Sequence, residues 1–233
     1  MNRTPIPPRH DAYRNIHKGL RAMMFDAVQR LGSTDPADAG ALSAALDQAD
    51  RLLAFMAAHV RHENEHLHTA IEARTPGGAR RTTDDHHEHV ESLAALRAQV
   101  AAMRGLGAGA AADALHRLYL DLAEFVAENL QHMRVEEMQN NAQLWFLYSD
   151  AELVAIHDRL LASVEPHVMG EAVGWMARAL SLPELVELVT EARNNVPAPA
   201  FEAMLELIGL QVEPARWAAL TRALEGADTA LAA

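Results

Sequence analysis

The sequence predicts an all-α protein, an up-and-down four-helix bundle followed by a C-terminal α-helical extension. Ala, Leu, Glu and Arg dominate the composition while Val, Ile and aromatic residues are scarce, which favours helices over strands. Half of the 233 residues are hydrophobic, enough for a substantial core. Apolar residues recur at helical spacing in four successive segments, separated by residues typical of turns.

The first two segments are expected to form neighbouring helices. Apolar residues line one face of a helix over about residues 9–31, and His17 lies inside that face. The turn residues of segment 32–40 predict a loop. A second helix is expected over about 41–73, and its inward face changes from apolar to polar halfway along.

The third and fourth helices follow the same pattern. The Thr-Pro-Gly-Gly run at 75–78 ends the second helix, and Thr82 or Thr83 can cap the third. Glycines within 105–109 interrupt the periodicity, and the fourth helix carries an apolar face over 118–136. The connections have the lengths usual in helical bundles.

The sequence divides into two predicted domains, the bundle at 1–149 and the extension at 150–233. Two Ser-x-x-Glu capping boxes, beginning at Ser149 and Ser181, each predict the start of a helix in the extension. The apolar residues of these helices need cover, either from the bundle or from another copy of the chain. We therefore expect a homodimer through the C-terminal helices as one arrangement.

Composition and charge exclude several kinds of function. The chain has no cysteine, so any metal must be bound by nitrogen and oxygen atoms. The net charge of -12 and the scattered Arg residues disfavour nucleic acid as a partner. The amino terminus lacks an apolar signal core, and no apolar run reaches membrane-spanning length. We expect a cytoplasmic protein that does not contact a membrane.

Histidine is the unusual part of the composition, with 13 residues, of which seven lie between His59 and His89. Two histidines are each followed four residues later by a glutamate, in the pairs His59 and Glu63, and His132 and Glu136. Residues four apart share one face of a helix, and here that face is the inward one. Such groups are costly to bury unless a metal ion keeps the imidazoles neutral and the carboxylates ionised.

His17 on the first helix and His86 on the third complete the predicted ligand set. The resulting order, His, His-x-x-x-Glu, His, His-x-x-x-Glu, repeats once and suggests two metal ions. Four imidazoles and two carboxylates suit iron, with zinc and manganese as alternatives. Bridging glutamates would leave coordination positions open for dioxygen, peroxide or nitric oxide. His89 shares the inward face with His86 and is a candidate seventh ligand.

Other interpretations of the motif are weaker. A single His-x-x-x-Glu is expected by chance in so His-rich a chain, and a structural bundle with a His-rich surface would also contain it. Ferritin-like proteins use Glu-x-x-His on two helices. Glu63 and His66 have that spacing, but Asn129 stands where the fourth helix would need a glutamate.

The remaining polar residues are given less specific roles. His62 and His66 flank the predicted ligands, either as their hydrogen-bonding neighbours or as tolerated residues at the end of the core. Tyr13 and Asn129 lie one turn from predicted ligands, and either donate hydrogen bonds to a bound ligand or fill the helix face. Six residues are expected on solvated faces: His68, His87, His116, Glu137, His157 and His167.

These residues together resemble the hemerythrin-like HHE cation-binding domain. The resemblance covers about residues 9–149 and rests on Tyr13-Arg14-Asn15-Ile16-His17-Lys18, the run from His59 to Glu63, Asp85-His86, and the run from His132 to Glu137. It implies an up-and-down four-helix bundle around a di-iron centre. It also implies the same six ligands: His17, His59, Glu63, His86, His132 and Glu136. Members of this family carry or sense dioxygen, reduce peroxide or nitric oxide, or handle iron for damaged clusters.

The chain departs from the oxygen-carrying hemerythrins, which use His-x-x-x-His in the third helix and His-x-x-x-x-Asp in the fourth. Val90 lies four residues after His86, and Glu136 replaces the longer-spaced Asp. The Cys-bearing domain of the cluster-repair members is also missing. We expect a non-haem di-iron protein that interacts with dioxygen, peroxide or nitric oxide. The alternative is a non-catalytic oxygen or iron sensor, or an iron-handling module, whose C-terminal helices contact a partner; the sequence does not separate enzyme from sensor.

Overall fold

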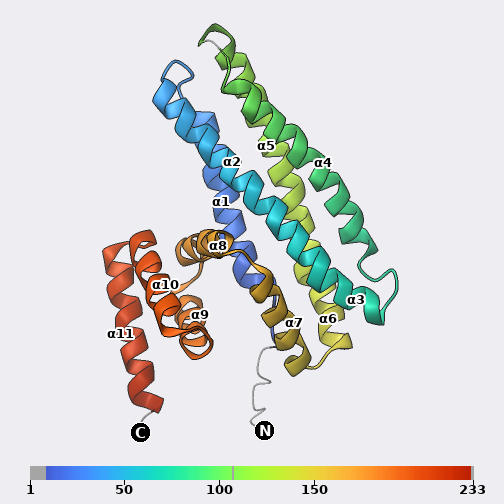
Figure 1. Cartoon of the computed structure of the whole chain (residues 1–233), viewed down its shortest axis with the longest axis vertical. Coiled ribbons are helices and arrows are strands. Elements are labelled where there is room, and N and C mark those ends of the chain that lie inside the picture. Colours follow the sequence, from blue (N-terminus) through green and yellow to red (C-terminus); the bar gives the residue numbers. More distant parts are fainter. Residues whose placement is uncertain (1–8, 107, 232–233) are drawn as a thin grey trace, which may run out of the picture. The chain divides into compact units, whose positions relative to one another are not determined.

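The computed structural model describes residues 9–106 and 108–231, apart from the side chains of 108–110 and 227–231. The described residues form helices joined by short connections and no strand, which confirms the predicted all-α class (Figure 1). They divide into two compact units. Of the described residues, 9–14, 25–106 and 108–164 form the first, and 15–24 and 165–231 form the second.

The first unit contains the long helices of the predicted bundle. Residues 25–33 of α1 (Arg14–Ser33) belong to it. Its other elements are α2 (Ala39–His62), η1 (Glu63–His68), α3 (Thr69–Arg74), α4 (Arg80–Met103), α5 (Ala108–Val135), η2 (Glu136–Asn140), α6 (Asn141–Leu147) and α7 (Asp150–Ser163). Helix α4 packs against both α2 and α5 (Figure 1). The elements η1 and η2 are π-helical turns that interrupt the predicted second and fourth helices without ending them.

Local capping interactions set the turns between these helices. The Asp38 carboxylate accepts hydrogen bonds from the backbone at residues 40 and 41, which begins α2. At the other end of the hairpin, Gly77 has a φ of 82°, a conformation that favours glycine. Glu72 accepts hydrogen bonds from the backbone N–H groups of Gly77 and Ala79, so the loop between α3 and α4 is tightly fixed.

The first unit has two apolar regions with a polar layer between them. Along α2 to α3, the buried residues change from Leu52 and Met56, through the polar layer, to Leu67 and Ile71. The second region is a cluster in which Tyr13, Leu67, Ile71 and Leu144 pack with side chains of α7. Both apolar regions exclude water from the polar layer, which includes His59 and Glu63.

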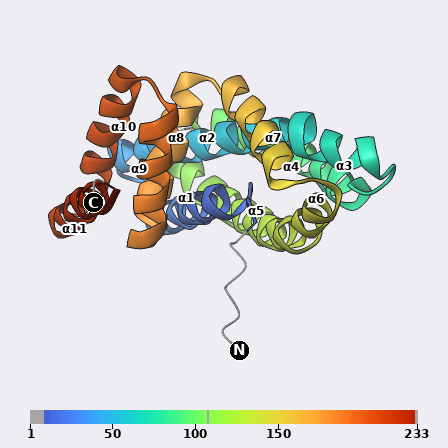
Figure 2. The same cartoon turned by 90° about the horizontal axis from the view of Figure 1, so that it is seen from below.

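The second unit contains the remaining helices, α8 (Pro166–Ala179), α9 (Leu182–Asn195), α10 (Ala198–Gln211) and α11 (Pro214–Leu231). Helix α10 packs on α8 and α9, and α11 packs on α9 (Figure 2). The capping boxes predicted at Ser149 and Ser181 are both present. The division into domains 1–149 and 150–233 stays a prediction.

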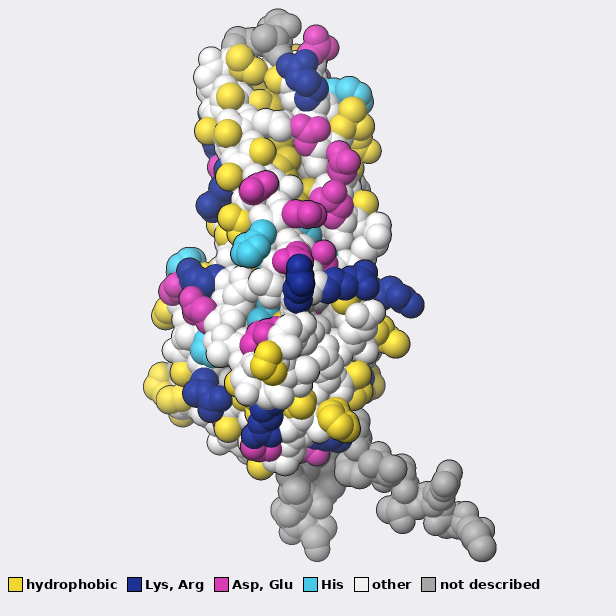
Figure 3. All heavy atoms as spheres, turned by 90° about the vertical axis from the view of Figure 1, so that its right-hand side faces the viewer, with side chains coloured by type: hydrophobic (Ala, Val, Ile, Leu, Met, Phe, Trp, Pro, Cys, Tyr) yellow, Lys and Arg dark blue, Asp and Glu magenta, His cyan; other side chains and the backbone are white. Residues whose placement is uncertain are grey.

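The helices of the described residues do not combine the length and apolar character that a membrane crossing requires. The face in Figure 3 carries Asp and Glu side chains among its Lys and Arg side chains. The expected absence of nucleic acid from the partners stays a prediction.

Candidate metal centre

The polar layer of the first unit holds histidine and glutamate side chains that are almost entirely removed from solvent. Glu63 is 2% exposed and Glu136 is 0% exposed. Moving a carboxylate out of water costs several kcal/mol unless positive charge or hydrogen bonds compensate it. Two such groups in one layer therefore require a compensating cation or protonated neighbours.

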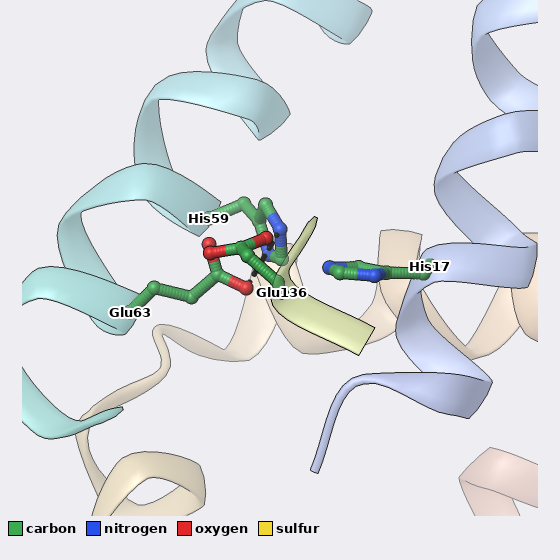
Figure 4. A group of neighbouring side chains, drawn as sticks. All are labelled: His17, His59, Glu63 and Glu136. Carbon is green, nitrogen blue, oxygen red and sulfur yellow. Dashed lines mark ion pairs between the residues drawn. The ribbon is translucent and has the colours of Figure 1, made fainter. Parts of the chain in front are cut away.

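Each glutamate lies next to the histidine one turn earlier on its own helix. His59 Nε2 is 3.2 Å from Glu63 Oε1, and His132 Nε2 is 3.3 Å from Glu136 Oε2. Figure 4 shows the side chains of His59, Glu63 and Glu136 directed toward one another. Both His-x-x-x-Glu pairs thus point into the interior, as their four-residue spacing predicts.

His86 from α4 joins the two pairs. Its Nε2 lies 2.9 Å from His132 Nε2, 3.4 Å from Glu63 Oε2 and 3.7 Å from Glu136 Oε1. Glu63, His86, His132 and Glu136 offer ligand atoms that all lie within 4.8 Å of one another, and so do His59, Glu63 and Glu136. Both glutamates belong to both groups. Each group could hold a metal ion.

Two hydrogen bonds orient the histidine rings. His86 Nδ1 lies 2.8 Å from Asn64 Oδ1, and His132 Nδ1 lies 3.1 Å from Asp85 Oδ2. Both oxygens are acceptors, so each Nδ1 carries a proton, and each Nε2 is the ring nitrogen that faces the layer. Outer hydrogen bonds of this kind fix metal-ligating histidines in proteins. The spacing of the histidines and glutamates does not predict the role of Asn64, and it includes Asp85 only as part of the motif Asp85-His86.

The charges of the layer shift the pKa values of its members. Burial alone would lower the pKa of His132, but the hydrogen bond and charge of Glu136, with the charge of Glu63, raise it to about 9. Burial and the charge of Glu63 oppose ionisation of Glu136, yet hydrogen bonds from His132 and His68 keep its pKa below the ordinary value. His132 and Glu136 are therefore an ion pair near neutral pH, and a metal ion that binds Nε2 must displace a proton.

Both π-helical turns begin at the glutamates, Glu63 in η1 and Glu136 in η2. π-helical turns inside α-helices are frequent at functional sites because they change which side chains face the interior. The prediction that His68 is solvated is wrong, since it is buried at 3% exposure. Its Nε2 lies 3.5 Å from Glu136 Oε1, and its ring stacks on that of His86.

His89, the candidate seventh ligand, is buried beside the site. Its ring meets those of Phe125 and His132 edge-on, at centroid distances of 5.8 and 4.8 Å. Burial and then the charges of His132 and His86 lower the pKa of His89 to about 4. Neither group of ligand atoms found in the described residues includes His89. Its role as a ligand stays a prediction.

Tyr13 and Asn129 both lie in the interior. Burial and the charges of Glu136 and Glu63 raise the pKa of Tyr13, so its hydroxyl stays neutral beside the carboxylates. The amide nitrogen of Asn129 donates to the carbonyl of Phe125 one turn earlier, at 2.8 Å, which suits the helix-face role.

The flanking histidines differ in burial. His62 is buried beside Arg61, with 3.1 Å between Nε2 and the guanidinium, whereas His66 is half-buried with its Nε2 3.0 Å from Ser163 Oγ. His157 is half-buried with its ring 4.9 Å from that of His10. The other residues predicted to be solvated are exposed or, for Glu137, half-buried: His87, His116, Glu137 and His167.

His17 is a buried residue of α1, and Figure 4 labels it on that helix. It lies in the segment Asn15–Met24, which belongs to the second compact unit. Its role as a ligand therefore stays a prediction.

The family model described as the hemerythrin HHE cation binding domain matches residues 10–144. No curated protein and no solved structure matches the chain significantly.

Proposed function

The chain belongs to the hemerythrin HHE cation binding domain family, and on this basis we propose that it is a non-haem di-iron protein that interacts with dioxygen, peroxide or nitric oxide. The proposed ligands are His17, His59, Glu63, His86, His132 and Glu136. Zinc and manganese are the alternative metals for this donor set.

The main support for this proposal is that Glu63 and Glu136 both belong to both groups of ligand atoms. Two buried carboxylates repel each other, and the charge of Glu63 opposes ionisation of Glu136. A divalent cation on each side of the pair would neutralise both carboxylates and accept the inward lone pairs of the histidines. The donors also fit iron chemically, because the chain offers imidazole and carboxylate but no thiolate.

His17 is assigned from the sequence pattern, in which it is the histidine on the apolar face of the first helix. Tyr13 lies one helical turn before His17 and therefore on the same face of the helix. Tyr13 packs in the first unit against Leu67 and Leu144, and burial and the site carboxylates raise its pKa.

The protein residues have three tasks around bound metal. Iron would supply the one-electron chemistry that small oxidants and nitric oxide require. Asn64 and Asp85 hold the protonated Nδ1 atoms and so keep His86 and His132 aligned. The apolar layers exclude bulk water, and the neutral hydroxyl of Tyr13 adds no charge to the carboxylate pair.

The test is metal analysis with an absorption spectrum of protein produced in iron-rich medium. We expect about two iron ions per chain, as in other dimetal bundles, and a charge-transfer absorption that changes when azide, peroxide or nitric oxide is added. The matched control is the double variant Glu63→Gln, Glu136→Gln. If the wild-type protein binds no more metal than this control, the proposal is overturned. If the wild-type protein binds metal but its spectrum does not change with azide, peroxide or nitric oxide, the metal has no open coordination position.

A further inference from the structure

The two π-helical turns place equivalent residues in the interior of the first unit. Each turn begins at a glutamate, and the residue five positions later is His68 in one half and Asn141 in the other. In an α-helix a residue five positions on would point roughly 140° away. The i→i+5 pattern of a π-helix instead returns it toward the starting side chain. Both residues are buried, at 3% and 1% exposure.

His68 is held with one ring nitrogen toward the carboxylate layer. Its Nδ1 lies 3.3 Å from Thr83 Oγ1, and its Nε2 lies 3.5 Å from Glu136 Oε1. With Nδ1 beside the hydroxyl of Thr83, Nε2 is the ring nitrogen that faces Glu136, and a cation that binds Nε2 would take the place of its proton. The amide nitrogen of Asn140 is 3.5 Å from the same Nε2, so a second polar group also approaches this ring nitrogen of His68.

His68 and His86 approach the same oxygen of Glu136. Their rings stack at a centroid distance of 4.7 Å with 18° between the planes, and His86 Nε2 is 3.7 Å from Glu136 Oε1. Two parallel imidazoles, each with Nε2 beside one carboxylate oxygen, can both bind a cation that this oxygen binds. Val90, which occupies the position four residues after His86, is 52% exposed and contributes nothing to the layer.

We propose that His68 is an additional imidazole ligand of the metal ion bound by Glu136 and His86, an inference that rests on the proposed function. The equivalent position in the other half is Asn141, whose amide is a much weaker donor for iron. The two metal positions are therefore unequal, and the position next to His68 has the higher affinity. The π-helical turn η1 is the structural feature that makes this fifth imidazole available.

The proposal is tested by counting coordinated histidines in the cobalt(II)-substituted protein by proton magnetic resonance. Each coordinated imidazole with a proton on its other nitrogen gives one exchangeable signal shifted by the metal. We expect His68→Gln to lose one such signal and to bind one of the two ions about 10–100-fold more weakly. The matched control, His66→Gln, changes a half-exposed histidine of the same π-helical turn and should keep every signal.

Retention of all shifted signals in His68→Gln would overturn the proposal, since a residue that only positions Glu136 contributes no coordinated ring. If His68→Gln does not fold, as judged by circular dichroism, Thr83→Val provides the second measurement. Loss of the hydroxyl should shift one exchangeable signal and speed its exchange with solvent, and an unchanged set of signals would also overturn the proposal. Failure of the wild-type protein to bind cobalt or iron would instead refute the proposed function.

Discussion

Replacing Glu63 by Gln is expected to remove both metal ions, whereas replacing His132 by Gln removes only one. The difference follows from the ligand groups, because Glu63 belongs to both and His132 belongs to one. Gln keeps the size of the glutamate side chain but removes the negative charge that a shared cation requires. Glu137→Gln, at the residue next to Glu136, is the control and should keep both ions.

The loss of metal has a calculable effect on thermal stability. At a free metal concentration 100-fold above the dissociation constant, each bound ion adds about 2.7 kcal/mol to the free energy of unfolding. Two ions add about 5 kcal/mol, and a chain of this size shifts its melting temperature by about 2–4 °C per kcal/mol. Added metal should therefore raise the melting temperature by about 10–20 °C in the wild type, by no more than half as much in His132→Gln, and hardly at all in Glu63→Gln.

The assay combines differential scanning calorimetry with metal analysis of the same samples, each measured with and without a chelator. Equal loss of metal in Glu63→Gln and His132→Gln would refute the assignment of His132 to a single ion. Retention of both ions in Glu63→Gln would refute the shared carboxylates. Circular dichroism of the metal-free variants checks that each one folds.

Three further predictions concern stability. The carboxylate of Glu184, whose pKa is lowered to about 2 by hydrogen bonds from Lys18 and Ser181, stabilises the fold above its ordinary pKa and loses that effect as the pH falls toward 2. Glu184→Gln should therefore lower the free energy of unfolding by about 1–2 kcal/mol at pH 7, and this value is modest because Lys18 is partly exposed. In urea titrations near pH 2 the variant and the wild type should have the same free energy of unfolding. Gly78→Ala would place a Cβ 2.8 Å from Ile71 Cγ2 and 2.9 Å from the backbone oxygen of Thr75. Urea unfolding should therefore show a loss of about 1–3 kcal/mol, and an unchanged midpoint would contradict the close packing of this turn. His89→Leu should keep the metal content and raise the free energy of unfolding of the metal-free protein by about 1 kcal/mol, because Nδ1 of His89 has no hydrogen-bond partner among the described residues. If the variant instead loses a metal ion, His89 is the seventh ligand.

Much of the fold is predictable because local chemistry decides it. The capping boxes at Ser149 and Ser181 and the glycine turn at Gly77 mark helix ends through interactions within a few residues. The predicted start of the first helix near residue 9 is wrong, since α1 begins at Arg14. Arg9 instead bonds Asp150 and backbone carbonyls at the end of α6, a long-range contact that no local pattern reveals.

The metal centre is likewise predictable from the sequence only in part. Four-residue spacing is a property of α-helices, so the inward direction of Glu63 and Glu136 can be predicted from the residues before them. Beyond each glutamate the helix changes to i→i+5 hydrogen bonding, and counting at 3.6 residues per turn then fails. For this reason the helical count predicts a solvated His68, which is in fact buried, and it does not predict the contact of Asn64 with His86.

The central claim is that two cations share the carboxylates of Glu63 and Glu136. Anomalous diffraction at the iron edge from crystals of the metal-loaded protein tests it most directly. We expect two peaks roughly 3.5–4 Å apart, the separation usual in two-metal sites, with a carboxylate of each glutamate between them. A single peak, or peaks that neither glutamate contacts, would contradict the account.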